Sequence, residues 1–247
     1  MADKEKEKRI MLADKYRPQC LAELGDSAHV TFLKALAHAD PTMTPHLILE
    51  GVRGSGKKLL VELFLRERYG CFATNRAEVQ LELPNKTEKK SMSALISHYH
   101  YQFNPMVHGL YDRTLIQSFI TEILQYRPIT KVPYRTIVVE DADLMSREAQ
   151  ESLRRTLETC LSNCRFIFLV NCEDTLISPI YSRCVKVRVA APTSDQIKTT
   201  LTRILVNEKG VCTEADMAAI EQIVTNCQRN YSRALYWLED HLVGPVV

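Results

Sequence analysis

The sequence predicts an α/β fold with a parallel sheet flanked by helices, followed by a small all-helical domain. A glycine-rich loop at residues 51–58 separates an apolar run from a helical stripe. Short apolar runs then alternate with helical patterns as far as residue 189, and only helical patterns follow from residue 190. Such alternation is typical of a parallel sheet covered on both faces. We therefore expect two domains, at residues 1–189 and 190–247.

Composition sets broad limits on this chain. It has 247 residues, of which 45% are apolar and 25% are charged, enough for a sizeable core. The 32 basic and 30 acidic side chains leave a formal net charge of +2. A contact with nucleic acid therefore has to come from a local basic patch or from partner subunits. No run of about 18 apolar residues occurs, so we expect no membrane contact through a spanning segment.

The eight cysteines are expected to be free thiols. The highly charged N-terminus lacks the apolar centre of a signal peptide, which indicates a reducing compartment. No Cys-x-x-Cys pair occurs, and Cys160 and Cys164 have no second pair at zinc-finger spacing. His98 and His100 alternate along an expected strand and should face one side together. Without a nearby carboxylate or cysteine they predict no metal site.

The first strand, loop and helix form the strongest motif. The loop reads Gly-Val-Arg-Gly-Ser-Gly-Lys-Lys, which is the phosphate-binding pattern Gly-x-x-x-x-Gly-Lys-[Ser/Thr] except for its last residue. An apolar run at 45–50 predicts the preceding strand, and a stripe from Leu59 predicts a helix ending near Gly70. A chance glycine-rich turn is the alternative. The candidate nucleotide-binding residues are Gly51, Val52, Arg53, Gly54, Ser55, Gly56, Lys57 and Lys58.

The last residue of this loop matters for chemistry. Backbone N–H groups of such a loop surround a polyphosphate, the lysine at position 57 reaches the outer phosphates, and the final hydroxyl normally ligates Mg²⁺. Lys58 has no acceptor atom for a cation. The sequence therefore predicts a site that holds a nucleotide but lacks part of the equipment for cleaving it.

Strands and helices continue to alternate after a polar stretch at residues 84–90. Residues 92–103 predict a strand or a hairpin, and residues 134–140 and 165–171 predict buried strands. Ser146 is the expected N-cap of a helix that runs to about Cys160. Another helix is marked by the apolar stripe Leu115, Ile116, Phe119, Ile120, Ile123 and Leu124.

Three helices are expected in the tail. Thr213 and Asp216 have the spacing of a capping box that begins the second of them. The first and third are marked by apolar stripes on one face, namely Ile197, Leu201, Ile204 and Leu205, and then Ala234, Leu235 and Leu238.

An acidic strand end provides the second chemical signal. In ATPases with this loop, an apolar strand ends in an aspartate that orients Mg²⁺, and a following glutamate polarises the attacking water. Here Glu140 takes the aspartate position and Asp141 the glutamate position, so each carboxylate is displaced by one methylene. Octahedral Mg²⁺ tolerates little displacement, so we expect weak hydrolysis. A purely structural acidic turn is the alternative.

Several motifs together give a family resemblance. Residues 14–18 (Asp-Lys-Tyr-Arg-Pro), the variant loop, residues 149–158 and residues 178–184 (Ser-Pro-Ile-Tyr-Ser-Arg-Cys) stand in the order seen in replication factor C small subunits. Replication factor C is the eukaryotic AAA+ clamp loader. The Lys-Lys loop ending and residues 97–105 resemble subunit 3 in human-style naming most closely, and the resemblance covers essentially the whole chain.

The resemblance implies a role for each matching residue. Asn171 matches the sensor-1 position near the γ-phosphate. Arg183 matches the arginine finger, which reaches the nucleotide of a neighbouring subunit and stabilises transferring charge, although a surface arginine is the alternative. Ser232 stands where hydrolysing subunits carry the sensor-2 arginine. The segment that packs around the adenine is matched by Lys15, Tyr16, Arg17 and Pro18.

The resemblance also implies a setting in the cell. It implies ATP or ADP as cofactor, with only weak support for Mg²⁺, together with nuclear localisation and a hetero-pentameric ring with other replication factor C subunits. Such a ring is a DNA-dependent ATPase that loads the sliding clamp PCNA onto primer-template DNA in replication and repair. Family members continue into a helical collar domain, which we expect to be absent here. An autonomous ATPase, such as an AAA+ helicase motor, and a regulatory binding module are the alternatives.

Overall fold

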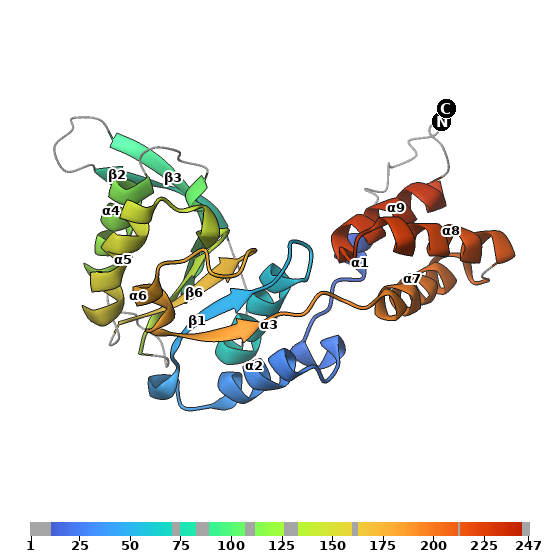
Figure 1. The fold of residues 1–247 in the computed structure, drawn as a ribbon, viewed down its shortest axis with the longest axis horizontal. Helices are drawn as coiled ribbons and strands as arrows, with labels where there is room; N and C mark the ends of the chain where they lie inside the picture. Colours follow the sequence, from blue (N-terminus) through green and yellow to red (C-terminus); the bar gives the residue numbers. More distant parts are fainter. Residues whose placement is uncertain are drawn as a thin grey trace, which may run out of the picture. The chain divides into compact units, whose positions relative to one another are not determined.

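The computed structural model describes residues 11–70, 75–82, 89–106, 112–125, 133–159, 163–211 and 213–243 (Figure 1). The chain forms two compact units. The sheet unit comprises Cys20–Val52 and Lys57–Val189, and the helical unit comprises Met1–Gln19, Arg53–Gly56 and Ala190–Val247. The N-terminal segment therefore groups with the tail rather than with residues 20–189. The physical reason is that Leu12 is buried in the core of the tail helices.

The sheet unit is built on a seven-stranded sheet in the order β2-β3-β4-β5-β6-β1-β7. Four neighbouring pairs, from β4 through β5, β6 and β1 to β7, are parallel, whereas β3 is antiparallel to both β2 and β4. The α/β prediction is confirmed, with the correction that the sheet is mixed. Its strands are β1 (His46–Glu50), β2 (Asn75–Glu82), β3 (Lys89–Ile96), β4 (His100–Phe103), β5 (Arg135–Val139), β6 (Cys164–Val170) and β7 (Cys184–Arg188).

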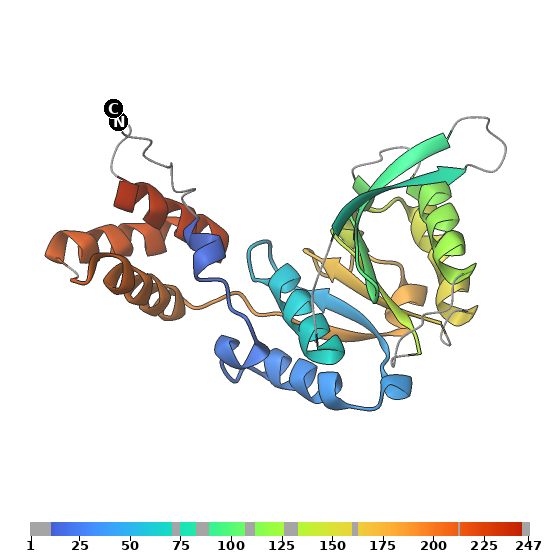
Figure 2. The same ribbon diagram turned by 180° about the vertical axis from the view of Figure 1, so that it is seen from behind.

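Helices cover both faces of this sheet (Figures 1 and 2). Helices α2 (Ala28–His38) and α3 (Lys57–Tyr69) cover one face, and α4 (Asp112–Gln125) and α5 (Arg147–Thr159) cover the other. Ser146 Oγ accepts from Ala149 N–H at 3.2 Å, which confirms the expected N-cap of α5. Short helical turns complete the unit, namely η1 (Leu21–Leu24), η2 (Pro41–Met43), η4 (Ala142–Leu144) and α6 (Ser178–Tyr181).

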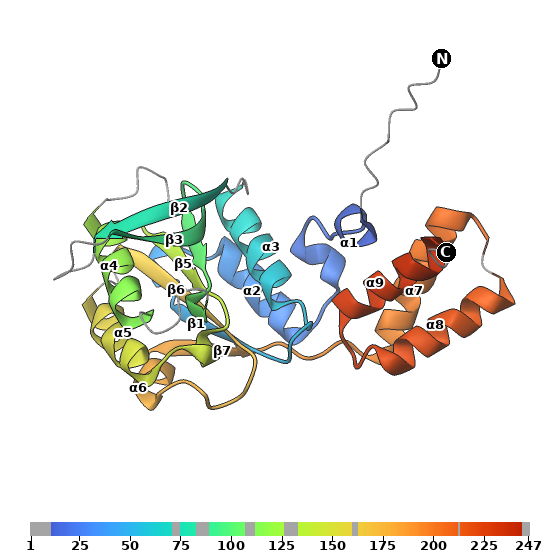
Figure 3. The same cartoon turned by 90° about the horizontal axis from the view of Figure 1, so that it is seen from above.

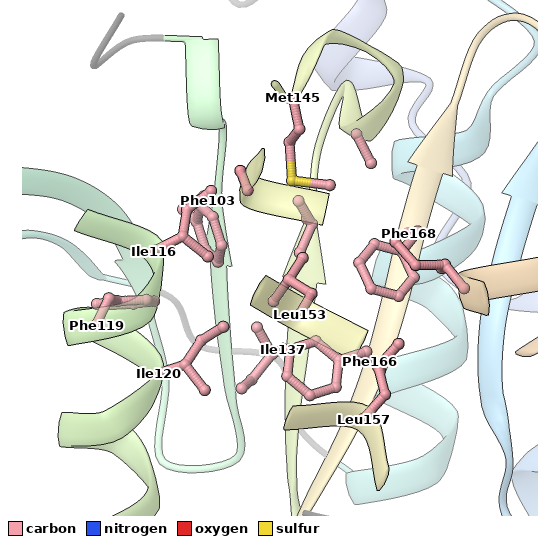
Figure 4. Close-up of a cluster of buried hydrophobic side chains, with 14 of the residues drawn as sticks. Phe103, Ile116, Phe119, Ile120, Ile137, Met145, Leu153, Leu157, Phe166 and Phe168 are labelled. Atoms are coloured by element: carbon pink, nitrogen blue, oxygen red, sulfur yellow. The ribbon is translucent and has the colours of Figure 1, made fainter. Parts of the chain in front are cut away.

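The core of the sheet unit has one layer on each face because side chains alternate along a strand. All seven residues of β6 are buried. Phe166 and Phe168 enter the layer under α4 and α5, and Ile167 and Leu169 enter the layer under α2 and α3. In the first layer the Phe166 and Phe168 rings stack at 5.8 Å (Figure 4). Burial of each such ring contributes about 2 to 3 kcal/mol, which keeps the carboxyl ends of β5 and β6 in fixed positions.

The helical unit contains α1 (Leu12–Lys15), α7 (Ser194–Lys209), α8 (Glu214–Asn226) and α9 (Tyr231–Val243) (Figure 3). The predicted apolar stripes of its helices meet in one core. Thr213 and Asp216 form the predicted capping box at the start of α8. Gly210 ends α7 at φ +79°, a left-handed conformation that favours glycine. Among the described residues, no helix is long and apolar enough to cross a membrane.

Most elements lie where the sequence predicts them, including the hairpin of β3 and β4. Helix α2 and strands β2 and β7 were not predicted. The prediction for the two histidines is wrong, because residues 97–99 form the turn between β3 and β4. His98 is exposed in that turn while His100 is buried on β4. The described cysteines, Cys20, Cys164, Cys172, Cys184 and Cys227, are free thiols as expected, and Cys71, Cys160 and Cys212 lie outside the described residues.

Candidate nucleotide-binding site

The phosphate-binding loop connects the carboxyl end of β1 to the first residue of α3. Gly51 N–H donates to the Val170 carbonyl at 3.1 Å, which ties the start of the loop to β6. Gly54 and Gly56 have φ values of +82° and +87°, so both positions require the conformational freedom of glycine. The sequence thus supplies glycine at the two turns that the loop needs.

Lys57 is folded back into this loop. Its side chain is buried, and Nζ donates to the carbonyls of Gly51 at 2.5 Å and Val52 at 2.9 Å. Carbonyl oxygens are neutral acceptors, and phosphate oxygens form stronger, charge-assisted hydrogen bonds with an ammonium group. The ammonium is therefore held at the loop and can exchange a carbonyl partner for a phosphate.

The residue after it, Lys58, pairs with the acidic end of β5. Lys58 Nζ lies 2.5 Å from Glu140 Oε2. The other oxygen of this carboxylate, Oε1, accepts from Gln102 Nε2 at 2.5 Å. Strand pairing explains the second contact, since Gln102 stands opposite Val138 and Glu140 N–H donates to the Phe103 carbonyl. Both oxygens of Glu140 are thus engaged by donors.

Asp141 is fixed in the same way. Its Oδ1 accepts from Asn171 Nδ2 at 2.8 Å, and its Oδ2 accepts from Asn104 Nδ2 at 2.9 Å. The residue has φ +43°, a left-handed conformation that aspartate adopts more readily than most residues. Asn171 also contacts Asp143, at 3.2 Å. The structure therefore brings together the predicted residues Lys57, Lys58, Glu140, Asp141 and Asn171, which all lie at carboxyl ends of strands or at the start of α3.

These residues do not fit Mg²⁺. The ion requires close to octahedral oxygen ligands at about 2.0 to 2.1 Å. Each carboxylate oxygen of Glu140 and Asp141 already accepts from an amide or ammonium group, and the Lys58 charge repels a cation at Glu140. Among the described residues, no group of three or more His, Cys, Asp or Glu side chains is arranged to hold a metal.

Sequence reasoning missed the amide donors Gln102 and Asn104. Their position at the carboxyl ends of the strands could have identified them, because ligand-binding residues in such sheets gather there.

Sequence reasoning also missed Glu50, which is 1% exposed directly before the loop and pairs with Lys186 Nζ at 2.5 Å. The contact with Glu50 is the main reason that the pKa of Lys186 is raised. Burial first, and then the Glu50 charge, raises the pKa of Tyr181.

Arg183 lies at the other end of the strands. It precedes β7, whose first residue stands opposite His46 of β1 and whose last residue stands opposite Glu50. Four steps along the strands separate these ends by about 13 Å. The guanidinium donates to the Pro179 carbonyl at 2.8 Å and forms an ion pair with Glu158. A groove of about 470 Å³ beside it is lined by Arg147, Glu151, Arg154, Arg155, Glu158, Ile177 and Pro179.

The remaining predicted residues belong to the helical unit. Lys15 Nζ lies 2.7 Å from Glu208 Oε1, and the Tyr16 hydroxyl donates to the same oxygen at 2.6 Å. The hydrogen bond to Glu208 raises the pKa of both side chains. Arg17 and Pro18 follow α1, and Ser232 lies in the first turn of α9. Their roles toward a nucleotide stay predictions.

Comparison with known proteins adds independent information. A family model described as DNA polymerase III, delta subunit, matches residues 26–193. Replication factor C subunit 5 of Schizosaccharomyces pombe is 33% identical over 235 residues, which are 93% of this chain and 64% of that protein. Replication factor C subunit 3 of Mus musculus is 32% identical, over 92% of this chain and 64% of that protein. The chain thus spans slightly less than two thirds of the length of these relatives.

Solved structures show the fold alone. A variant of RuvB from Thermotoga maritima superposes with a TM-score of 0.63 over 92% of this chain and 67% of that chain, at 16% sequence identity. An identity this low indicates a shared architecture and does not transfer an activity.

Proposed function

The chain belongs to the family of replication factor C small subunits, and from this membership we propose that it is a nucleotide-holding subunit of a clamp loader. It binds ATP or ADP at the loop, hydrolyses little by itself, and supplies Arg183 to the site of a neighbouring subunit. The assembled ring contains other replication factor C subunits. It uses ATP to load the PCNA clamp onto primer-template DNA during replication and repair in the nucleus.

The contrast between the loop and the two carboxylates carries this proposal. The loop keeps its glycine turns and Lys57, which are the parts that bind phosphate. Glu140 and Asp141, which would have to organise hydrolysis, are instead engaged by Lys58, Gln102, Asn104 and Asn171. A carboxylate held by two donors is a poor base for an attacking water. Binding is therefore retained while cleavage is disfavoured.

Different residues of the chain have different roles in the proposed nucleotide site. Backbone N–H groups of the loop and the first turn of α3 donate to phosphate oxygens, and the helix dipole favours the negative charge there. Lys57 exchanges a carbonyl partner for a phosphate oxygen. Asn171 donates to Asp141 and thereby fixes the position of that carboxylate. No metal is assigned to this site because its residues do not fit one.

The location of Arg183 supports its role in a neighbouring site. It lies at the ends of β1 and β7 opposite to the loop, about 13 Å away along the strands, so it cannot serve the chain's own phosphates. A guanidinium placed across a subunit interface stabilises charge in phosphoryl transfer. The groove beside Arg183 carries charged side chains of both signs, which can take part in polar contacts across such an interface.

Two measurements test the proposal. Purification of the native protein is expected to bring four further AAA+ subunits and the sliding clamp with it. The pure chain is expected to bind adenine nucleotide and to turn ATP over at close to background. Robust hydrolysis by the pure chain that is lost in Lys57→Ala would favour an autonomous ATPase instead.

A further inference from the structure

The ion pair between Lys58 and Glu140 joins the two positions that normally hold Mg²⁺ in this type of site. We propose that the Lys58 ammonium acts in place of the divalent cation, so that a nucleoside di- or triphosphate binds this loop without metal. The inference rests on the proposed nucleotide-binding function of the same site and specifies its ligand as the metal-free nucleotide.

The charges at the start of α3 favour this arrangement. Lys57 and Lys58 are its first two residues, and its first turn carries no acidic residue. Positive side chains at a helix N-terminus are unfavourable because the N–H groups already carry partial positive charge there. Glu140 compensates one of the two lysines. The N–H groups of the first turn still carry partial positive charge, which a bound polyanion balances.

Burial shows which partner is fixed and which is free to contact a ligand. The Glu140 side chain is 12% exposed and held from its other oxygen by Gln102, whereas the Lys58 side chain is 60% exposed. An ammonium group has three N–H donors, and among the described residues only Glu140 accepts from this one. The carboxylate therefore positions Lys58, and two donors remain for phosphate oxygens.

A merely structural ion pair explains less. The lysine end of this pair is solvated, which limits its contribution to stability, so folding alone gives little reason to place Lys58 at the motif's metal-ligating position. Steric fit gives no reason either, since the side chain is largely solvated. A positioned ammonium at the phosphate-binding loop accounts for the residue type, the partner and the exposure together.

The test is the affinity of the full chain for fluorescent ADP and ATP, measured in excess Mg²⁺ and in EDTA. The unmodified protein should give the same affinity in both buffers. Lys58→Thr should weaken binding in EDTA by about tenfold, the worth of a charge-assisted hydrogen bond. The double variant Lys58→Thr with Glu140→Asp should bind more tightly in Mg²⁺ than in EDTA, because it supplies a hydroxyl ligand at position 58 and shortens the carboxylate at position 140 by one methylene.

A matched control is Lys34→Thr, which removes a lysine paired with Asp26 on the surface of the sheet unit and should leave binding unchanged. Thermal unfolding checks that each variant is folded. Binding by the unmodified protein that requires Mg²⁺ would overturn this inference while leaving the proposed function standing. Absence of nucleotide binding in both buffers would overturn the proposed nucleotide site itself, and the inference with it.

Discussion

Arg183 forms an ion pair with Glu158, a carboxylate in the last turns of α5. Glu158 also lines the groove beside this pair, and the Arg183 side chain keeps 29% of its surface exposed. The same guanidinium also donates to the Pro179 carbonyl. Arg183 is thus oriented by its own chain, yet it has to leave Glu158 before it can contact a phosphate in another subunit.

The first prediction concerns this arginine in a reconstituted clamp loader. Arg183→Ala should slow hydrolysis at the neighbouring site by roughly 10³-fold or more, because the charge it supplies is needed only in the transition state. Nucleotide binding to this chain should be unaffected. ATP turnover stimulated by DNA and clamp gives the first quantity, and nucleotide titration of the variant gives the second.

Two variants serve as controls for that experiment. Arg188→Ala removes an arginine at the other end of the same edge strand, one that pairs with Glu173, and should leave turnover intact. Glu158→Gln should also preserve turnover, since it only frees the guanidinium. A silent Arg183→Ala, or a Glu158→Gln as damaging as Arg183→Ala, would mean that the ion pair is structural.

The second prediction concerns buried His46. Its Nδ1 accepts from Phe166 N–H at 3.0 Å, which requires an unprotonated nitrogen there. Burial, aided by the charge of Arg165, lowers the pKa of His46 from 6.5 to about 4. The unfolded chain therefore binds a proton more readily than the folded chain between these values. The free energy of unfolding is therefore unaffected by protonation of His46 above about pH 6.5. It decreases as the pH falls toward 4, by at most about 3 kcal/mol.

Unfolding free energies measured between pH 7 and pH 4.5 check this prediction. His46→Gln should reduce the pH dependence of stability, although it also lowers stability at pH 7. His100, whose pKa burial likewise lowers to about 4, should continue to contribute in that variant. An identical slope in His46→Gln and the unmodified protein would refute the assignment.

Several elements could be predicted from sequence because their side chains report burial directly. β6 is buried at every residue, and α4 buries Ile116, Phe119, Ile120 and Ile123, so both show a clear pattern. β7 was missed because it is an edge strand in which only Val187 is buried, among exposed Val185, Lys186 and Arg188. Helix α2 was missed because it buries only three side chains and its apolar face is narrow.

Some residues of the candidate site could be predicted from the sequence and others could not. The loop is a local motif, so its residues could be predicted from spacing alone. The partners of Glu140 and Asp141 could not, since Gln102 and Asn104 lie 38 and 37 residues away in the sequence. They reach the carboxylates only through the β4–β5 pairing register. The pairing of Lys58 with Glu140 depends on tertiary structure in the same way.

The third prediction concerns Asp216 in the helical unit. This buried carboxylate accepts from Lys209 Nζ at 2.7 Å, His241 Nε2 at 2.9 Å and Thr213 Oγ1 at 2.7 Å. These contacts, the one with Lys209 first, hold the pKa of Asp216 well below its usual value. A lowered carboxyl pKa stabilises the folded state above the unfolded-state pKa, and this stability is lost as the pH falls through the folded-state value.

Asp216→Asn should therefore destabilise the helical unit near neutral pH and lose that effect in strong acid. Urea unfolding followed by the fluorescence of Trp237, the single tryptophan and a residue of α9, reports on this unit. Asp195→Asn, in the first turn of α7, is the matched control because Asp195 is exposed. Equal effects of the two substitutions at pH 7 would contradict the role given to Asp216.

The last prediction separates binding from hydrolysis within the proposed ring. Lys57→Ala removes the ammonium group that lies 2.5 Å from the Gly51 carbonyl oxygen. In the proposed complex this group binds a phosphate oxygen. Loss of a charge-assisted hydrogen bond should weaken nucleotide binding to this chain by about tenfold or more. Total turnover of the ring should fall much less than with Arg183→Ala, because the carboxylates of this site are engaged by donors and the site is proposed to contribute little hydrolysis. Titration of the isolated variant and turnover of the reconstituted ring measure the two effects. If Lys57→Ala abolished turnover while Arg183→Ala had no effect, the chemistry would belong to this chain's own site, and the autonomous ATPase would become the better account.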